Sequence, residues 1–264
     1  MKKSFHHIMV SKLYSSIVET FQQSCSFVKL KKRTGQVRQG SASELNIDDA
    51  KLRAWDIKIT QESSGVAKLI LKYLPEGGCF IDIGANVGAC SAQVIKARKA
   101  EAYLFEPVVY YYDFCCNRFR ENSEVRVENL ALSNETGTCD LHLDRENLGW
   151  NTSIVEKVVG DMVKTQVRSC TFDEFMISSK IKEIDVIKID VEGNEFRVLE
   201  GMKGTIKNLC RKPVIICEVG WGVDSHPYWD REVAAFEWLF SNGYERINYD
   251  IKSTQDLIFL PIDQ

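Results

Sequence analysis

The sequence lacks several features that would place the protein in a specialised class. It has no apolar run of the ~20 residues that a membrane-spanning helix needs, and its first residues lack the continuous apolar core of a secretory signal. Its nine cysteines are scattered and form no Cys-x-x-Cys pair. These absences argue against a membrane-embedded chain, a disulfide scaffold and a zinc finger. They predict reduced thiols and a cytoplasmic location.

An excess of positive charge is also missing. The formal net charge of the 264 residues is −3, so no nucleic-acid partner is predicted. The charge is uneven, because residues 1–40 contain eight Lys/Arg and one acidic residue, a balance of +7 that leaves −10 for the remainder. With 44% hydrophobic residues and no internal repeat, the chain can form one large domain, alone or with an appendage.

The appendage is expected at the N-terminus. Apolar residues from Ile8 to Val28 recur at helical spacing and are followed by a basic segment, residues 29–38. This pattern predicts either a helix packed on the main domain or on another subunit, as in a homo-oligomer, or a basic amphipathic anchor on an anionic membrane surface. Residues 34–48 resemble a linker. We therefore predict an extension and linker over 1–48 and a main domain over 49–264.

A glycine-bracketed turn is the most informative motif of the main domain. An apolar strand, residues 80–83, runs into Gly84-Ala85-Asn86-Val87-Gly88, and the next strand ends at Glu106, 22 positions after Gly84. Such a turn brings backbone N–H groups and a helix N-terminus against a ligand, and the acidic residue can bind ribose hydroxyls. The motif predicts a cofactor site that accepts a ribose.

The middle of the turn indicates which cofactor binds. A dinucleotide fingerprint requires glycine where this chain has Asn86, and Asp82 and Glu106 both direct negative charge at the site. These residues favour S-adenosylmethionine, which carries a cationic sulfonium and an amino group. An NAD(P)-dependent oxidoreductase is disfavoured by Asn86 and by the absence of a Tyr-x-x-x-Lys relay. A non-catalytic protein that keeps only the cofactor fold is disfavoured by the acidic positions.

Two further strands carry charged residues at their ends. In the strand 186–190, Lys188 and Asp190 share one face because strand side chains alternate. Burial of either charged group without a partner would cost free energy. They form either an internal ion pair that shapes the sheet or polar groups at the mouth of the cofactor cleft. The strand 213–219 contains Glu218 near its end. Three strands thus bring carboxylates to one edge of the predicted sheet.

Helical and strand patterns alternate along the main domain. This order predicts a mostly parallel, doubly wound α/β sheet with ligands beyond the carboxyl ends of its strands. We expect helices at 63–74, 88–98, 110–122, 194–208 and 231–242, strands at 80–84, 102–106, 125–130, 186–190 and 213–219, a hairpin over 138–143, and closing strands near 244–249 and 256–260.

In these motifs the sequence resembles the FkbM family of S-adenosylmethionine-dependent methyltransferases. The matching segments are 80–88, 105–107, 129–133 with Gly137, 151–153, 171–175, 188–193, 199–201 and Glu218. The resemblance implies a Rossmann-like class I methyltransferase fold with an antiparallel edge. It also implies O-methylation of a hydroxyl on a carbohydrate, a glycan or a hydroxylated secondary metabolite, and it leaves the acceptor open.

The motif residues are assigned to the cofactor and to catalysis. The cofactor-binding residues are Asp82, Gly84, Ala85, Asn86, Gly88, Glu106, Pro107, Asn129 and Ala131. Methyl transfer depends mainly on positioning, with a base that removes the hydroxyl proton. Asp190 is the first choice for this base because it ends the strand that in this fold faces the transferred methyl group. Lys188 either holds it ionised or is structural, and the alternative bases are Glu192, Glu218 and His226. Asp190, Glu192 and Glu218 could also gather a divalent cation, but no Asp/Glu/His spacing requires one, and no metal site is predicted.

Acceptor binding is assigned to two segments. The loop 221–229 follows Glu218 and combines aromatic rings, which pack against sugar C–H surfaces, with hydroxyl-binding groups. Alternatively, its tryptophans only anchor the loop to the core. A second polar segment, 151–153, is expected to cover the cleft from the other side. The predicted acceptor-binding residues are Trp221, Asp224, Tyr228, Trp229, Asn151 and Ser153.

Overall fold

The computed structural model describes residues 47–144, 148–149, 151–154, 162–219, 226–247 and 255–262. The predicted N-terminal extension therefore lies outside the described residues, except for the last two residues of its linker. In the part of the chain that is described, no helix combines the length and the apolar character needed to cross a membrane. The two roles considered for residues 1–40, docking and membrane anchoring, remain predictions.

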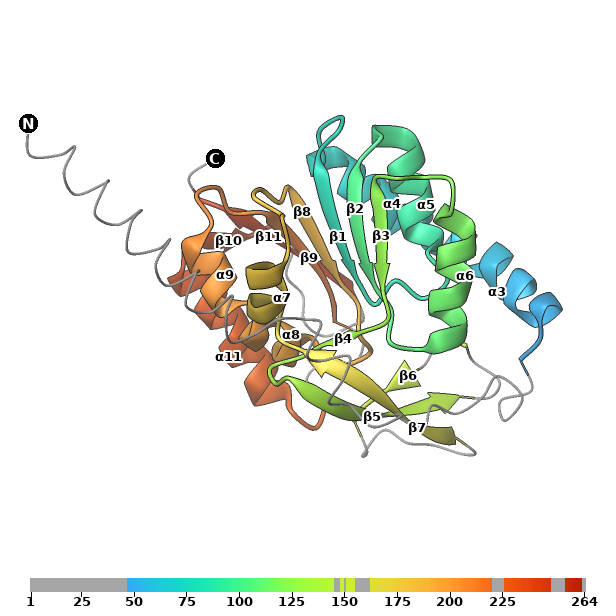
Figure 1. Ribbon diagram of the computed structural model, residues 1–264. Coiled ribbons are helices and arrows are strands. Elements are labelled where there is room, and N and C mark those ends of the chain that lie inside the picture. Colours follow the sequence, from blue (N-terminus) through green and yellow to red (C-terminus); the bar gives the residue numbers. More distant parts are fainter. Residues whose placement is uncertain are drawn as a thin grey trace, which may run out of the picture.

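A seven-stranded mixed sheet forms the centre of the molecule (Figure 1). Its strand order is β10-β11-β9-β8-β1-β2-β3, with β9, β8, β1, β2 and β3 parallel and β11 antiparallel to both of its neighbours. The strands are β1 (Cys79–Ile83), β2 (Glu101–Phe105), β3 (Val125–Glu128), β8 (Val186–Ile189), β9 (Val214–Val219), β10 (Tyr244–Arg246) and β11 (Gln255–Pro261). The predicted Rossmann-like class I methyltransferase fold, including its antiparallel edge, is confirmed.

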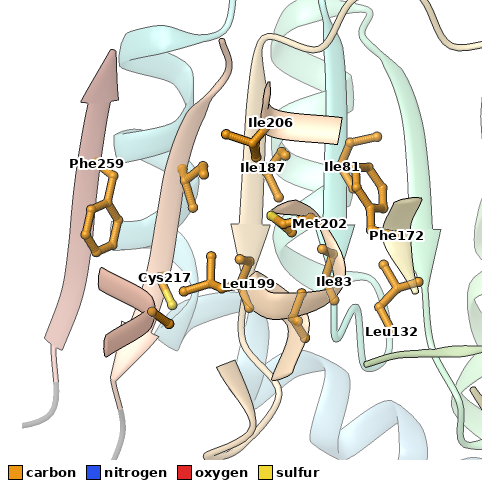
Figure 2. Packing of buried hydrophobic residues seen from close by; sticks show 14 of the residues in the cluster. Ile81, Ile83, Leu132, Phe172, Ile187, Leu199, Met202, Ile206, Cys217 and Phe259 are labelled. Carbon is orange, nitrogen blue, oxygen red and sulfur yellow. The ribbon is translucent and has the colours of Figure 1, made fainter. Parts of the chain in front are cut away.

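Helices cover both faces of this sheet because its buried strands are apolar on both sides. In β1, Ile81 and Ile83 point into one core, whereas Phe80 points into the other. The first core is closed by α7 (Phe172–Ser178), α8 (Glu195–Gly201), α9 (Lys203–Asn208) and α11 (Trp229–Ser241), and Figure 2 shows part of it. The second core is closed by α4 (Ser64–Tyr73), α5 (Ala89–Arg98) and α6 (Val109–Phe119).

A second, four-stranded sheet lies at the end of the main sheet to which β1, β2 and β3 point (Figure 1). Its order is β4-β7-β5-β6, from β4 (Ala131–Leu132), β5 (Gly137–Asp144), β6 (Asn151–Thr152) and β7 (Met162–Cys170). The predicted hairpin over 138–143 is wrong, because these residues form the single strand β5. Leu141 and Leu143 alternate with polar neighbours and face a buried cluster, so no turn interrupts the strand.

Three helical features also differ from the prediction, one of which is the unexpected helix α7 (Phe172–Ser178). Helix α3 (Asp49–Glu62) was not expected; its N-cap Asp48 accepts a hydrogen bond from the backbone N–H of Lys51 at 2.8 Å. The single helix expected over 194–208 is divided into α8 and α9 at Met202. The Asp173 carboxylate accepts the backbone N–H groups of Gly204 and Thr205, at 2.8 and 2.6 Å, and so caps the second piece.

Candidate active site

A cavity of about 740 Å³ lies at the carboxyl ends of the parallel strands. The main sheet contributes the turn after β1, the end of β2 and the loop after β8, whereas the second sheet contributes β4, β5 and β6. Ile59 and Glu62 of α3 and Val66 of α4 line a further side. The second sheet and α3 therefore enclose a site that the main sheet alone would leave open, and its size suits a nucleoside-containing cofactor together with an acceptor.

The glycine turn uses its own N–H groups within the protein. The backbone N–H groups of Gly84 and Ala85 both donate to the carbonyl of Phe105 at 3.0 Å, and that of Gly88 donates to Ala85 at 2.8 Å. Those of Asn86 and Val87 donate to side-chain oxygens at 2.8 Å. A diphosphate requires N–H groups that are free to donate. The N–H groups of residues 84–88 are thus engaged within the protein, and the turn fits a cofactor without a diphosphate.

Asn86 replaces the second glycine because asparagine tolerates the left-handed conformation, here with φ of 52°. Its side-chain oxygen accepts the indole N–H of Trp55 at 2.9 Å, and its amide donates to the carbonyl of Leu148 at 3.3 Å. The residue lines the cavity and also joins the turn to α3 and to the segment after β5. Sequence reasoning missed Trp55, although the capping residue Asp48 signals the helix that carries it.

Glu106 lies at the end of β2, where it lines the cavity and is only 5% exposed. Its carboxyl group accepts the backbone N–H groups of Asn86 and Val108, both at 2.8 Å. Burial raises the pKa of Glu106 to about 8, against the opposing effect of these two hydrogen bonds. Glu106 thus fixes the glycine turn and still presents carboxyl oxygens to the cavity.

Lys188 and Asp190 form part of an internal ion-pair chain. The Lys188 ammonium lies 3.2 Å from Asp82 and 3.0 Å from Asp190, and Asp82 also accepts the Ser91 hydroxyl at 2.5 Å. Burial alone would lower the pKa of Lys188, but the two carboxylates outweigh it and raise this pKa well above its usual range. Asp82 is fully buried, whereas the side chain of Asp190 is 27% exposed and lines the cavity. Lys188 therefore holds one oxygen of Asp190 in place at the cavity wall.

Four carboxyl groups gather beside Lys188 and form what we term the acidic cluster: Asp190, Glu192, Glu218 and Asp256, all of which line the cavity. Burial, together with Asp190 and Glu218, raises the pKa of Glu192 to about 9. Asp190, followed by burial, raises the pKa of Glu218 to about 8. In the cofactor-free protein near neutral pH, Glu192 and Glu218 are therefore largely protonated.

The loop from Asp190 to Asn194 is held by three buried side chains. Glu195 accepts the backbone N–H groups of Val191 and Gly193 at 3.0 and 3.1 Å, and Thr152 donates to the carbonyl of Glu192 at 2.9 Å. His226 lies 2.9 Å from the carbonyl of Gly193. These contacts stabilise a strained backbone, because Glu192 has a φ of 56°.

His226 is fixed as a neutral donor. Its Nδ1 accepts the backbone N–H of Tyr228 at 3.0 Å, so the proton lies on Nε2, which donates to the Gly193 carbonyl. The side chain is 2% exposed and does not line the cavity. Although Glu195, His226 and Glu232 bring possible ligand atoms within 4.8 Å, a metal at Nε2 would require an imidazolate. His226 positions the loop and is not placed to act as a base.

The structure divides the predicted site residues into three groups. Those that line the cavity are Gly84, Ala85, Asn86, Glu106, Pro107, Ala131, Lys188, Asp190, Glu192, Glu218, Asn151 and Ser153. Those placed elsewhere are Asp82, Gly88, Asn129, His226, Tyr228 and Trp229. Trp221 and Asp224 lie outside the described residues.

Predicted site residues that do not line the cavity contact the segments that form its wall or pack in the core. The amide of Asn129 donates to the carbonyls of Glu106 and Pro107 at 3.0 and 2.9 Å, so it shapes the loop after β2 and does not touch the cavity. Tyr228 and Trp229, at the start of α11, pack against the first core, which for Trp229 agrees with the anchoring alternative. Sequence reasoning missed Asn194, Arg197 and the end of β4, which line the cavity.

The fold and the cavity together define a class I methyltransferase. A family model described as the methyltransferase FkbM domain matches residues 82–245, and the chain belongs to this family. It is therefore an S-adenosylmethionine-dependent methyltransferase, and the cavity fits this cofactor, because the glycine turn offers no diphosphate site and the wall is acidic.

Two curated relatives are methyltransferases. The hexuronic acid methyltransferase AglP of Haloferax volcanii is 26% identical over 73% of this chain and 79% of its own length. The methyltransferase sdnD of Sordaria araneosa is 29% identical over 54% of this chain and 67% of its own length. Among solved structures, a SAM-dependent methyltransferase from Aquifex aeolicus aligns with 81% of this chain and 97% of its own, at 14% identity and a TM-score of 0.42.

The acidic cluster predicts that cofactor affinity depends on pH. As the pH rises through about 8 to 9, Glu218 and Glu192 lose their protons, and the cavity becomes more attractive to a sulfonium. We expect the affinity for S-adenosylmethionine to increase about 3- to 10-fold per pH unit between pH 6.5 and 8.5. S-adenosylhomocysteine has no sulfonium and should respond less, as calorimetry at three pH values would measure. Equal pH dependence of the two ligands would contradict this linkage.

Proposed function

We propose that the protein transfers a methyl group from S-adenosylmethionine to a hydroxyl oxygen of a carbohydrate, a glycan or a hydroxylated metabolite. The single observation that carries the proposal is the cavity-facing carboxylate of Asp190, held by Lys188 at 3.0 Å beside the predicted cofactor contacts. A fixed carboxylate at this place orients a hydroxyl group and accepts its proton. The similarity to the hexuronic acid methyltransferase of Haloferax volcanii favours a sugar acceptor over other hydroxyl compounds.

The cofactor supplies an electrophilic methyl group, and residues of the protein bind the two substrates and orient the acceptor hydroxyl. Gly84, Glu106 and Pro107 surround the predicted cofactor side of the cavity, whereas Asn151 and Ser153 of the second sheet offer polar groups to an acceptor. Asp190 aligns the acceptor hydroxyl, and the Lys188 ammonium, 3.0 Å away, holds this carboxylate in place. The second sheet and α3 line further sides of the cavity. Positioning of this kind supplies most of the rate enhancement expected for a methyl transfer.

An oxidoreductase is the alternative class, and the hydrogen bonds of the glycine turn weigh against it. Each N–H from Gly84 to Gly88 already has a partner in the protein, so none is left for a diphosphate. We expect S-adenosylmethionine to bind at micromolar concentrations and NAD not to bind. The cytoplasmic location remains part of the proposal; it is supported by the eight described cysteines, all of which are free thiols.

A substitution at Glu106 tests the cofactor assignment. Glu106→Ala removes a group that we assign to the ribose hydroxyls, and it also frees the N–H groups of Asn86 and Val108. We expect affinity for S-adenosylmethionine to fall by about 1.5–3 kcal/mol, the range for charge-assisted hydrogen bonds, as measured by calorimetry. Glu101→Ala, at the opposite end of β2, is the matched control and should bind as the parent does. Unchanged affinity in Glu106→Ala would refute the ribose assignment.

A further inference from the structure

One part of the cavity presents hydrogen-bond donors in an otherwise acidic wall. Lys188 and Arg197 are the two basic residues among those that line the cavity in the described part of the chain. Lys188 is neutralised by Asp82 and Asp190. Arg197 makes no ion pair with any described residue, and it lies within reach of a molecule in the cavity. Its positive charge is therefore available to a ligand.

The contacts of Arg197 leave most of its donors unused. The guanidinium carbon lies 5.2 Å from the ring centre of Phe196, and Nη1 lies 3.5 Å from the side-chain oxygen of Asn134, at the outer limit of a hydrogen bond. A guanidinium has five N–H donors in a planar fork that matches a carboxylate. The contact with the Phe196 ring leaves these donors unsatisfied.

Asn194 supplies an independent observation. It is 7% exposed, it lines the cavity, and its side-chain Nδ2 is buried without a hydrogen-bond partner in the described structure. A buried amide donor without a partner costs about 1–3 kcal/mol unless a ligand satisfies it. Asn194 is the N-cap of α8, three residues before Arg197, and both side chains line the cavity.

The position of this pair relative to the cofactor contacts indicates which ligand it serves. Arg197 approaches Asn134, which follows β4, and acts electrostatically on Cys139 of β5. Most of the predicted cofactor contacts lie instead at the turn after β1 and at Glu106 and Pro107, and one, Ala131, lies on β4. The pair therefore lies on the side of the cavity that the second sheet covers, where the acceptor contacts Asn151 and Ser153 are predicted.

We infer that Arg197 and Asn194 bind a carboxylate of the acceptor, so that the substrate is an acidic sugar or another hydroxy acid. The inference rests on the proposed function and adds the chemical class of its substrate. The guanidinium balances one negative charge and the neutral amide adds a hydrogen-bond donor, so the pair matches a carboxylate better than a dianion such as a phosphate ester. Asp190 then receives a hydroxyl of the molecule that Arg197 holds.

The experiment compares acids with their neutral methyl esters. Glucuronate, galacturonate and quinate, each beside its methyl ester, are titrated by ligand-observed NMR into the full-length protein saturated with S-adenosylhomocysteine. We expect at least one acid to bind about 10- to 100-fold more tightly than its ester. Arg197→Met should abolish this preference, and Asn194→Ala should reduce it about 2- to 10-fold. Arg168→Met removes the same charge from β7, outside the cavity, and should leave the preference intact.

The outcomes separate this inference from the proposed function. If no acid binds more tightly than its ester, or if Arg197→Met keeps the preference, the carboxylate assignment is wrong. If Arg197→Met instead weakens S-adenosylmethionine in a parallel calorimetric titration, Arg197 serves the cofactor and the inference also fails. Failure of the proposed function would appear separately, as the absence of S-adenosylmethionine binding by the parent protein.

Discussion

Replacing Asp190 with asparagine should lower turnover by about 10²–10⁴-fold, the usual loss on removal of a general base. Asparagine keeps the shape and can still donate or accept hydrogen bonds, but it cannot take the proton of the acceptor hydroxyl. Affinity for S-adenosylmethionine should stay within a few-fold of the parent, because its main contacts are assigned to the glycine turn and Glu106. The fold should persist, since Lys188 retains its contact with Asp82 at 3.2 Å.

The measurement pairs calorimetry with turnover on an acceptor found by the acid and ester comparison. Asp140→Asn is the control, because Asp140 also lines the cavity but lies on β5 and pairs with Lys164 at 2.7 Å. Near-normal turnover in Asp190→Asn would transfer the role of base to Glu218 or Glu192. Loss of both binding and turnover would make Asp190 part of the cofactor site.

The main sheet and its charged edge could be predicted because they depend on local patterns. The largely apolar run of β1, which is buried along its whole length, and the position of Asp190 directly after β8 are visible in short stretches of sequence. The ion pair between Lys188 and Asp190 follows from strand alternation alone, and it is confirmed at 3.0 Å. Residues at strand ends in a parallel sheet share one edge whatever the connections between them.

The second sheet could not be predicted in the same way, because its pairing is non-local. β5 pairs with β7 from Gly137↔Ser169 to Asp144↔Met162, so partners at the far end are separated by 32 positions. β6 and β4 contain only two residues each, too few for a periodic signal. Asn194 and Arg197 can be recognised as cavity residues only once the position of the second sheet over α8 is known. The local signal for these two residues in the sequence is their position directly after the 188–193 motif.

The interpretation of the glycine turn and of His226 depended on hydrogen bonds that a sequence does not contain. A turn with two glycines predicts free N–H donors, but here Phe105, Glu106 and Asn86 accept them. A histidine in a loop after a catalytic strand suggests a base, but both ring nitrogens of His226 are engaged by the backbone. In both cases the same residues support the cavity wall.

Gly84→Ala should be among the most destabilising single methyl additions in the protein. Gly84 has a φ of 82°, and a Cβ built there would lie 1.8 Å from the backbone oxygen of Asp190. Because neither partner is a flexible side-chain end, the turn after β1 and the end of β8 would have to separate. We expect the free energy of unfolding to fall by at least ~3 kcal/mol, which is a large effect for a point substitution. Thermal unfolding should show a melting temperature about 6–12 °C lower.

Gly77→Ala separates the backbone strain at Gly84 from the clash. Gly77 has a φ of 69° but no atom within 4 Å of the added Cβ, so this variant should lose only the ~1–2 kcal/mol of a left-handed alanine. The difference between the two variants measures the contact between Gly84 and Asp190. Because that contact sets the distance between the cofactor turn and the proposed base, Gly84→Ala protein that still folds should also bind S-adenosylmethionine more weakly, whereas Gly77→Ala should bind normally. Equal melting temperatures for the two variants would mean that the turn and the catalytic loop do not pack this closely.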